Sequence, residues 1–312
     1  MAPAARVLVT GAGGFVGSHV VTALASVGYG VVRIGRTDHG GSDFAKDIGP
    51  CTTWDDALDG VNFVVHAAGI AHATNRQAGD YHRVNAAGTR RLAEEAARAG
   101  VERLVFLSSI GVHGGSSAEP VSEISPLVLD SPYVSSKLDA EIALAAVADS
   151  TNLETVVLRP SLVYGPSAPG SMARLASLLD RRVPLPFRSV TNRRSFLYVE
   201  NLVDLIAMCL THPSASGRTF VVSDAEALST RELIEALCEI RGDSPRLFPA
   251  PVWALRLGAA AIGRAADAER LLGSMDVNIG RVEAELGWKP PHRTQHGLEQ
   301  SYRLSLADPV GE

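Results

Sequence analysis

The sequence predicts an α/β protein with a doubly wound parallel sheet in its first half and a smaller C-terminal α/β lobe. Short, almost continuously apolar runs alternate there with longer stretches of helical periodicity, a pattern typical of parallel strands covered on both faces. The alternation implies right-handed βαβ crossovers. The predicted strands are Val7–Thr10, Val31–Ile34, Val61–His66, Leu104–Ser108 and Thr155–Arg159. The predicted helices between them cover residues 15–27, 77–99 and 132–149.

The pattern changes after Pro166. Residues 161–171 are rich in proline, glycine and serine and are predicted as a loop. Shorter strands and helices are predicted beyond it, at 172–182, 194–199, 201–212, 218–223, 229–241 and 251–264. We therefore expect a first domain over residues 1–169 and a second lobe over residues 170–312, with some segments of the second half returning to the first domain.

Composition excludes several classes of protein. The 312 residues include 29 Lys and Arg against 34 Asp and Glu, a net charge of −5 that lacks the footprint of a nucleic-acid binder. The three cysteines form no CxxC pair, so we expect no disulfide scaffold, no metal site and a cytoplasmic location. The apolar stretch Val252–Gly263 is too short to span a membrane, which favours a buried or interface helix. Because a strand pattern starts almost at the N-terminus, we expect no signal peptide.

A glycine-rich loop follows the first predicted strand. Residues 5–17 read ARVLVTGAGGFVG, so a strand, three spaced glycines and a helix follow one another. Gly11 permits the tight turn, Gly14 lets backbone N–H groups approach a pyrophosphate, and Gly17 lets the helix pack close to the strand. The alternative is a turn without a ligand, but the strand before and the helix after favour dinucleotide binding by a Rossmann-type domain.

The end of the second predicted strand bears on which dinucleotide binds. An acidic residue there pairs with a free ribose 2′-OH, whereas an arginine accommodates a 2′-phosphate. Here Gly35 occupies the expected acidic position and Arg36 follows it. The sequence thus predicts NAD with tolerance of NADP. Two alternatives stay open: Arg36 stacks on the adenine or points to water, and Asp38 reaches the ribose.

A tyrosine and a lysine stand at helical spacing after Pro132. Tyr133 and Lys137 lie on one face of a helix, where an ammonium group lowers the pKa of a phenol and makes it a general base. The alternative is an ordinary surface pair. Ser108 and Ser109 end a preceding parallel strand, the edge at which such sheets bind ligands, and one of their hydroxyls is predicted to support the reacting oxygen.

These motifs resemble a known family. TGAGGFVG, HAAG, NAAGT, FLSSIGVHG, YVSSK, RPSLVYGP and ELGWKP stand in the order found in extended short-chain dehydrogenases/reductases, and more narrowly in NAD-dependent epimerases/dehydratases of nucleotide sugars. The similarity extends to about residue 300. The resemblance assigns the catalytic hydroxyl to Ser109, the base to Tyr133 and its partner to Lys137, which would also hold the nicotinamide ribose.

The same resemblance implies the binding residues. The cofactor contacts it implies are Gly11, Gly14, Phe15, Val16, Gly17, Asp47, Ile48, Ala67, Ala68, Gly69, Asn85 and Pro160. For the nucleotide sugar it implies Ser109, Ser161 near the nicotinamide amide, and Arg194 near the diphosphate. The lobe 170–312 departs from the family, because only Arg270 and Arg281 stand near a usual arginine position. His113 replaces a usual tyrosine and is interpreted as a loop-packing residue.

The resemblance implies 4-epimerisation of a UDP-sugar through a transient 4-keto sugar. Family dehydratases have an Asp-Glu pair after the strand-end hydroxyl, where this chain has Ile110 and Gly111. An NADPH-dependent 4-keto-sugar reductase is the alternative that Arg36 supports, and a non-catalytic dinucleotide-sensing regulator is the alternative from another class. The alanine-rich helices at 77–99 and 132–149 predict a homodimer, and the family predicts a role in polysaccharide biosynthesis.

Overall fold

The computed structural model describes residues 4–36, 42–71 and 77–307. Its main sheet has seven strands in the order β3-β2-β1-β4-β5-β6-β9, and every neighbouring pair is parallel. The strand order reverses direction beside β1, as it does in doubly wound folds. The strands are β1 (Arg6–Thr10), β2 (Gly30–Gly35), β3 (Phe44–Ala45), β4 (Phe63–His66), β5 (Arg103–Leu107), β6 (Glu154–Pro160) and β9 (Arg218–Val222). The predicted fold class is confirmed.

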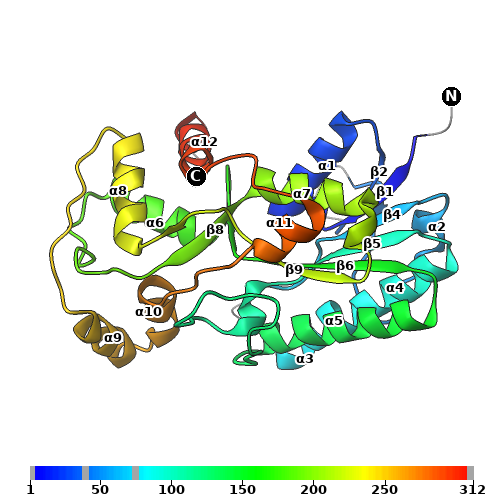
Figure 1. Ribbon diagram of the computed structural model, residues 1–312, viewed down its shortest axis with the longest axis horizontal. Helices are drawn as coiled ribbons and strands as arrows, with labels where there is room; N and C mark the ends of the chain where they lie inside the picture. The colour runs from blue at the N-terminus through cyan, green and yellow to red at the C-terminus, as the bar shows by residue number, and fades with distance from the viewer. Residues whose placement is uncertain (1–3, 37–41, 72–76, 308–312) are drawn as a thin grey trace.

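Helices cover both faces of this sheet (Figure 1). One layer holds α1 (Phe15–Ser26), α7 (Val199–Thr211) and α11 (Gly280–Leu286); the other holds α4 (Gly88–Arg98) and α5 (Pro132–Ser150). Each layer packs against its own cluster of buried apolar side chains, so the strands contribute to a core on either side. Burial on both faces explains why these strands are continuously apolar in sequence.

A second, three-stranded sheet lies beside the first in the order β10-β8-β7. It contains β7 (Leu162–Tyr164), β8 (Arg194–Tyr198) and β10 (Ala227–Leu228). The remaining helices are α2 (Asp55–Leu58), α3 (Ala78–Tyr81), α6 (Ser171–Asp180), α8 (Thr230–Ile240), α9 (Val252–Ala261), α10 (Ala265–Leu272) and α12 (Thr294–Ala307), with short 3₁₀ turns η2 (Ile110–His113) and η3 (Pro213–Ala215). Although β9 comes from the second half of the chain, it completes the first sheet.

The structure corrects three sequence expectations. Residues 162–164, expected to be loop, form β7, because pairing with β8 supplies hydrogen bonds that no local pattern shows. The single helix expected at 77–99 is α3, a π-helical segment η1 (His82–Ala87) and α4. The stretch expected to be a buried or interface helix forms α9, and because none of its residues is buried, only the interface alternative remains a prediction. Within the three described ranges, no helix has the length and apolarity that crossing a membrane requires.

Candidate active site

The glycine-rich loop forms a closed cradle between β1 and α1. Gly11 has φ +70°, and a Cβ on Gly17 would lie 2.0 Å from the Gly11 carbonyl oxygen. The N-terminus of α1 has no side-chain cap, so its first N–H groups, those of Phe15 and Val16 among them, are available to a ligand. Uncapped donors at a helix N-terminus and a loop without side chains fit a dinucleotide pyrophosphate.

Replacing Gly17 by alanine is expected to weaken NAD binding at least about tenfold, because the new methyl group cannot fit against the backbone of Gly11. Titration of the protein with NAD, followed calorimetrically, measures the effect. Gly258→Ala is the matched control, since a Cβ there meets nothing within 4 Å. Unchanged NAD affinity in Gly17→Ala would show that this loop is not the phosphate site.

Three further predicted cofactor residues follow the carboxyl ends of β2 and β3. Arg36 is exposed directly after β2, whereas Asp38 lies outside the described residues. Asp47 is exposed, and Ile48 packs against Gly88, where an added Cβ would meet the Ile48 side chain. Arg33 does not take part, because its guanidinium pairs with Asp43 at 2.8 Å.

A buried relay of hydrogen bonds fixes the segment after β4. The Ala68 N–H donates to Thr10 Oγ1 at 3.1 Å, and Thr10 Oγ1 lies 2.6 Å from His66 Nδ1. His66 Nε2 contacts Thr89 Oγ1 at 2.8 Å, and that hydroxyl donates to the Asn85 carbonyl. Since the Thr89 proton is committed, His66 donates through Nε2 and accepts the Thr10 proton at Nδ1. Burial lowers the pKa of His66 to about 3, which keeps the ring neutral.

Asn85 joins this segment to α5. Its Oδ1 accepts the Ile70 N–H at 2.8 Å, and its Nδ2 donates to the Ile70 carbonyl and to Ser136 Oγ, both at 3.0 Å. A Cβ on Gly69 would lie 3.1 Å from Asn85 Oδ1 and 3.4 Å from Lys137 Nζ. Gly69 therefore runs close to Lys137, because no side chain separates them.

Ser109, Tyr133 and Lys137 meet at the carboxyl end of β5. The Ser109 hydroxyl lies within hydrogen-bonding reach of the Tyr133 phenol, and its oxygen accepts the Gly111 N–H at 3.1 Å. Lys137 Nζ donates to the Leu107 carbonyl at 2.8 Å and lies 4.6 Å from the centre of the Phe106 ring. Ser131 caps the N-terminus of α5, which places Tyr133 in its first turn.

The electrostatics of the site differ from the sequence expectation. Burial raises the pKa of Tyr133 above its usual value, and the Ser109 hydrogen bond opposes that rise. Burial also lowers the pKa of Lys137 to about 8, while the Glu141 carboxylate raises it. The expected lowering of the Tyr133 pKa by Lys137 is therefore wrong for the protein without ligand, because desolvation dominates and Lys137 donates to a backbone carbonyl.

The structure separates the roles of the two strand-end serines. Ser108 donates to Glu141, which lies about two turns along α5 from Tyr133, so its hydroxyl proton is not directed at the Tyr133 phenol. Pro160 ends β6, and Ser161 follows with its N–H bonded to the Val222 carbonyl at 2.8 Å. Within the described part of the chain, the buried Ser161 hydroxyl has no partner. A bound ligand could satisfy this hydroxyl.

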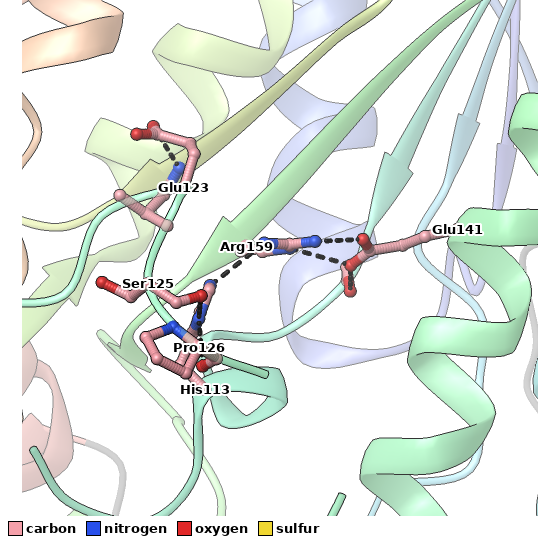
Figure 2. Close-up of polar contacts among 8 residues, drawn as sticks. His113, Glu123, Ser125, Pro126, Glu141 and Arg159 are labelled. Atoms are coloured by element: carbon pink, nitrogen blue, oxygen red, sulfur yellow. Dashed lines mark hydrogen bonds and ion pairs between the residues drawn. The ribbon is translucent and has the colours of Figure 1, made fainter. Parts of the chain in front are cut away.

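A buried polar network that sequence reasoning missed lies behind this site (Figure 2). Arg159 binds Glu141 through Nε at 3.1 Å and Nη2 at 2.6 Å, and its Nη1 contacts His113 Nε2 at 3.0 Å. Because arginine only donates, His113 accepts at Nε2 and donates through Nδ1 to the carbonyls of Ser125 and Pro126, both at 3.1 Å. The network connects α5, β6, η2 and the loop at 125–126, and it makes His113 a packing residue, as interpreted from the sequence.

Folding stability is expected to fall as the pH drops below about 6.5, the ordinary histidine pKa. Burial lowers the pKa of His113 in the fold, so the unfolded chain takes up a proton that the folded chain refuses. The loss reaches at most about 1.4 kcal/mol per pH unit for one histidine. His66 adds to the effect, so the thermal midpoint of His113→Gln is compared with wild type between pH 7.5 and 5. A variant that loses stability as steeply as wild type would contradict this role.

The predicted substrate arginine lies in the second sheet. Arg194 Nη1 donates to the carbonyls of Gly273 at 3.0 Å and Gly115 at 3.5 Å, and burial lowers its pKa. Arg193 pairs with Asp276 at 3.0 Å. Arg270 and Arg281 pair with Asp267 and Glu285 respectively. A cavity of about 410 Å³ lies nearby, and Asn192, Arg256, Gly273 and Ser274 are among its lining residues.

Comparison with known proteins gives consistent matches. The profile of the NAD dependent epimerase/dehydratase family matches residues 7–223. A UDP-glucose 4-epimerase from Vibrio cholerae is 35% identical, covering 96% of this chain and 95% of its own. One from Azospirillum brasilense is 28% identical, covering 98% and 94%. The structure of MoeE5 in complex with UDP-glucose and NAD superposes with a TM-score of 0.79 at 25% identity, covering 97% of this chain and 99% of that one.

Proposed function

The chain belongs to the NAD-dependent epimerase/dehydratase family, and from this premise we propose that it is an NAD-dependent enzyme that epimerises a UDP-sugar at C4. The observation that carries the proposal is the meeting of Ser109, Tyr133 and Lys137 at the carboxyl end of β5. Two similar proteins are named UDP-glucose 4-epimerases, and a similar structure holds UDP-glucose and NAD.

The residues present fit NAD. Gly11, Gly14 and Gly17 leave room for the pyrophosphate of NAD. Ala67–Gly69 and Lys137 would lie along the part of NAD that follows the pyrophosphate, and the unpartnered Ser161 offers it a hydroxyl. When bound, NAD supplies a hydride acceptor and a positive charge. The chain itself then positions the sugar and moves the proton.

Tyr133 is the proposed general base, since its phenolate oxygen can take the proton of a sugar hydroxyl and later return it. Ser109 has one hydroxyl proton, which faces the Tyr133 oxygen in the protein without ligand and would turn to the sugar oxygen as negative charge develops there. Lys137 supplies the cation that favours the phenolate. Because burial raises the pKa of Tyr133, ionisation requires positive charge in the site, and Lys137 is the group of this chain that provides it.

The test is conversion of UDP-glucose to UDP-galactose without any added nicotinamide. A recycled cofactor makes external NADPH unnecessary, so product must accumulate to equilibrium. UDP-N-acetylglucosamine, UDP-glucuronic acid and TDP-glucose are tested in parallel to define the base and the sugar. Failure to interconvert any of these sugars, despite bound NAD, would overturn the proposal.

The second candidate is a reductase of 4-keto nucleotide sugars that uses NADPH. The observation that favours it is Arg36, exposed directly after β2 where Gly35 replaces the acidic residue. Oxidation of added NADPH by a 4-keto sugar, without interconversion of UDP-glucose and UDP-galactose, would select this candidate. Arg36→Ala would then weaken binding of NADPH more than that of NADH.

We also propose that the chain forms a homodimer through α4 and α5. These helices pack side by side on one face of the sheet, and Ile142 of α5 is 60% exposed there. Ile142→Asp is expected to give a monomer mass by light scattering at micromolar protein. In an isologous dimer each subunit would bury one new aspartate in the interface, and two unpaired buried charges oppose association. Ile124→Asp, at a side chain 92% exposed in a loop, is the control. A wild-type monomer mass would contradict the dimer.

The location proposed is the cytoplasm, where reduced thiols persist. All three cysteines, Cys51, Cys209 and Cys238, are free thiols in the structure.

A further inference from the structure

Helix α9 carries apolar side chains on its outer face as well as on its inner face. On the inner face, Val252, Leu255 and Ala259 pack against a small cluster formed by Val190, Ala268 and Leu272. On the outer face, Trp253 and Leu257 are one turn apart and are 68% and 63% exposed. Ile262 follows the helix at 72%, and Phe248 precedes it at 46%. We call these four exposed side chains the α9 face.

Cationic side chains surround the α9 face in an otherwise acidic protein. The segments 181–190 and 244–272 contain seven arginines and two carboxylates, although the whole chain has a net charge of −5. The two segments lie together, because the Phe248 N–H donates to the Leu185 carbonyl and the Leu185 N–H donates to the Arg246 carbonyl. Within the described residues, Arg181, Arg188 and Arg264 are exposed and have no ion-pair partner. The surroundings therefore suit an anionic partner.

Helix α9 lies toward one end of the long axis of the molecule (Figure 1). It is remote from β1, β2 and the glycine-rich loop, and it is separate from α4 and α5, where the homodimer is proposed. The α9 helix is therefore a separate part of the molecule from both regions.

We propose that the α9 face docks on the surface of an anionic phospholipid bilayer. Trp253 and Leu257 would enter the headgroup region, where tryptophan is favoured at membrane interfaces. The arginines would contact lipid phosphates with their guanidinium groups while their stems lie along apolar surface. A ten-residue helix is too short to span, so this attachment is peripheral and reversible.

A second copy of the chain is a poorer occupant. In an isologous dimer the same patch faces itself, so the arginines around one α9 face would meet those around the other. A bilayer with anionic lipids satisfies both the apolar and the cationic parts of the surface. The inference does not depend on the proposed epimerase activity, because none of the four side chains of the α9 face is assigned to the candidate active site.

The protein's own tryptophans provide the assay. Trp54 and Trp288 are 0% and 1% exposed, so Trp253 is the tryptophan whose fluorescence a surface ligand changes. The full chain is mixed with vesicles of phosphatidylcholine alone or with 30% phosphatidylglycerol. We expect a blue shift and cosedimentation with the anionic vesicles, weakening in 0.5 M NaCl, and neither effect with the neutral ones.

Leu257→Ser separates apolar docking from simple charge attraction. It is expected to weaken binding to the anionic vesicles by about tenfold or more, because serine lacks the apolar surface that leucine would bury in the bilayer. Ile124→Ser, which removes a similarly exposed apolar side chain far along the sequence, is expected to leave binding unchanged. Unaltered thermal midpoints in both variants show that the fold is intact.

Three results would overturn the proposal. They are the absence of a fluorescence shift with anionic vesicles, binding that Leu257→Ser leaves unchanged, and a vesicle-free dimer that Leu257→Ser dissociates. The last result would assign the α9 face to a second copy of the chain.

Discussion

Replacing Tyr133 by phenylalanine is expected to reduce the turnover of UDP-sugar by about 10²- to 10⁴-fold, the contribution of a positioned general base. Phenylalanine keeps the ring, which packs edge-on toward Tyr81 at a centroid distance of 6.5 Å, but it cannot take a proton. The glycine-rich cradle is untouched by this change, so NAD content is expected to match wild type. Rates of sugar interconversion, together with NAD released on denaturation, measure both quantities.

The control for this variant is Tyr29→Phe, which removes a phenol whose ring instead packs against Phe63, 6.4 Å between centroids. It is expected to keep full turnover. Full turnover in Tyr133→Phe would remove the chemical argument for an enzyme and support the dinucleotide-sensing regulator. A loss of NAD together with activity would instead show that Tyr133 acts through cofactor binding.

The strands could be predicted from the sequence where burial on both faces produces a continuous run of apolar residues. Strands β1, β4 and β5 are apolar at nearly every position because both faces of the sheet are covered, and a strand pattern of this type is visible in one dimension. By contrast, β3 and β10 have two residues each, so they depend on pairing with a neighbour rather than on a periodicity. The same reason applies to β7, which the proline- and glycine-rich context concealed.

Those parts of the candidate site that are marked by residue type and spacing could be predicted from the sequence. Sequence reasoning could not choose between Ser108 and Ser109 without the resemblance, because successive residues at a strand end point in different directions. In the structure Ser108 donates to Glu141, and Ser109 lies beside the Tyr133 phenol. The predicted lowering of the Tyr133 pKa was also wrong, since burial of the phenol depends on atoms from several helices and strands.

Glu141 is the residue that the sequence could have indicated. It stands four residues after Lys137, as Lys137 stands four after Tyr133, so the three occupy one face of α5. Its partner Arg159 comes from β6, eighteen residues away, and no local pattern predicts that pair. The Thr10–His66–Thr89 relay was missed for the same reason.

Neutralising one member of the Glu141–Arg159 pair is expected to destabilise the fold by about 3–5 kcal/mol, because the other charge is then left buried and unpaired. Both side chains are 8% exposed, and the pair joins the helix of Tyr133 and Lys137 to the strand that ends at Pro160. Glu141→Gln and Arg159→Gln each keep hydrogen-bonding groups for Ser108 and His113 while they remove one charge. Chemical denaturation with urea measures the change in the free energy of unfolding.

The double variant Glu141→Gln with Arg159→Gln distinguishes a charge effect from a packing effect. Removing both charges leaves no unpaired ion, so its destabilisation is expected to be smaller than the sum of the two single effects. Strict additivity would show that the two charges do not interact. Glu235→Gln is the control, since Glu235 pairs with Arg231 on α8 and the two side chains are 38% and 45% exposed, so no buried charge is left unpaired.

The double variant also tests whether Glu141 acts on catalysis through Lys137. Burial lowers the pKa of Lys137 to about 8 and the Glu141 carboxylate raises it, so loss of that carboxylate lowers the Lys137 pKa further. The other groups around Lys137 are Tyr133 on its own helix and neutral His66 from β4. Lys137 would then lose its proton at lower pH, and the alkaline limb of the pH–kcat profile is expected to move to lower pH in the double variant. If the Glu141–Arg159 pair has only a structural role, the pKa of Lys137 does not change in the double variant. The alkaline limb then stays where wild type has it.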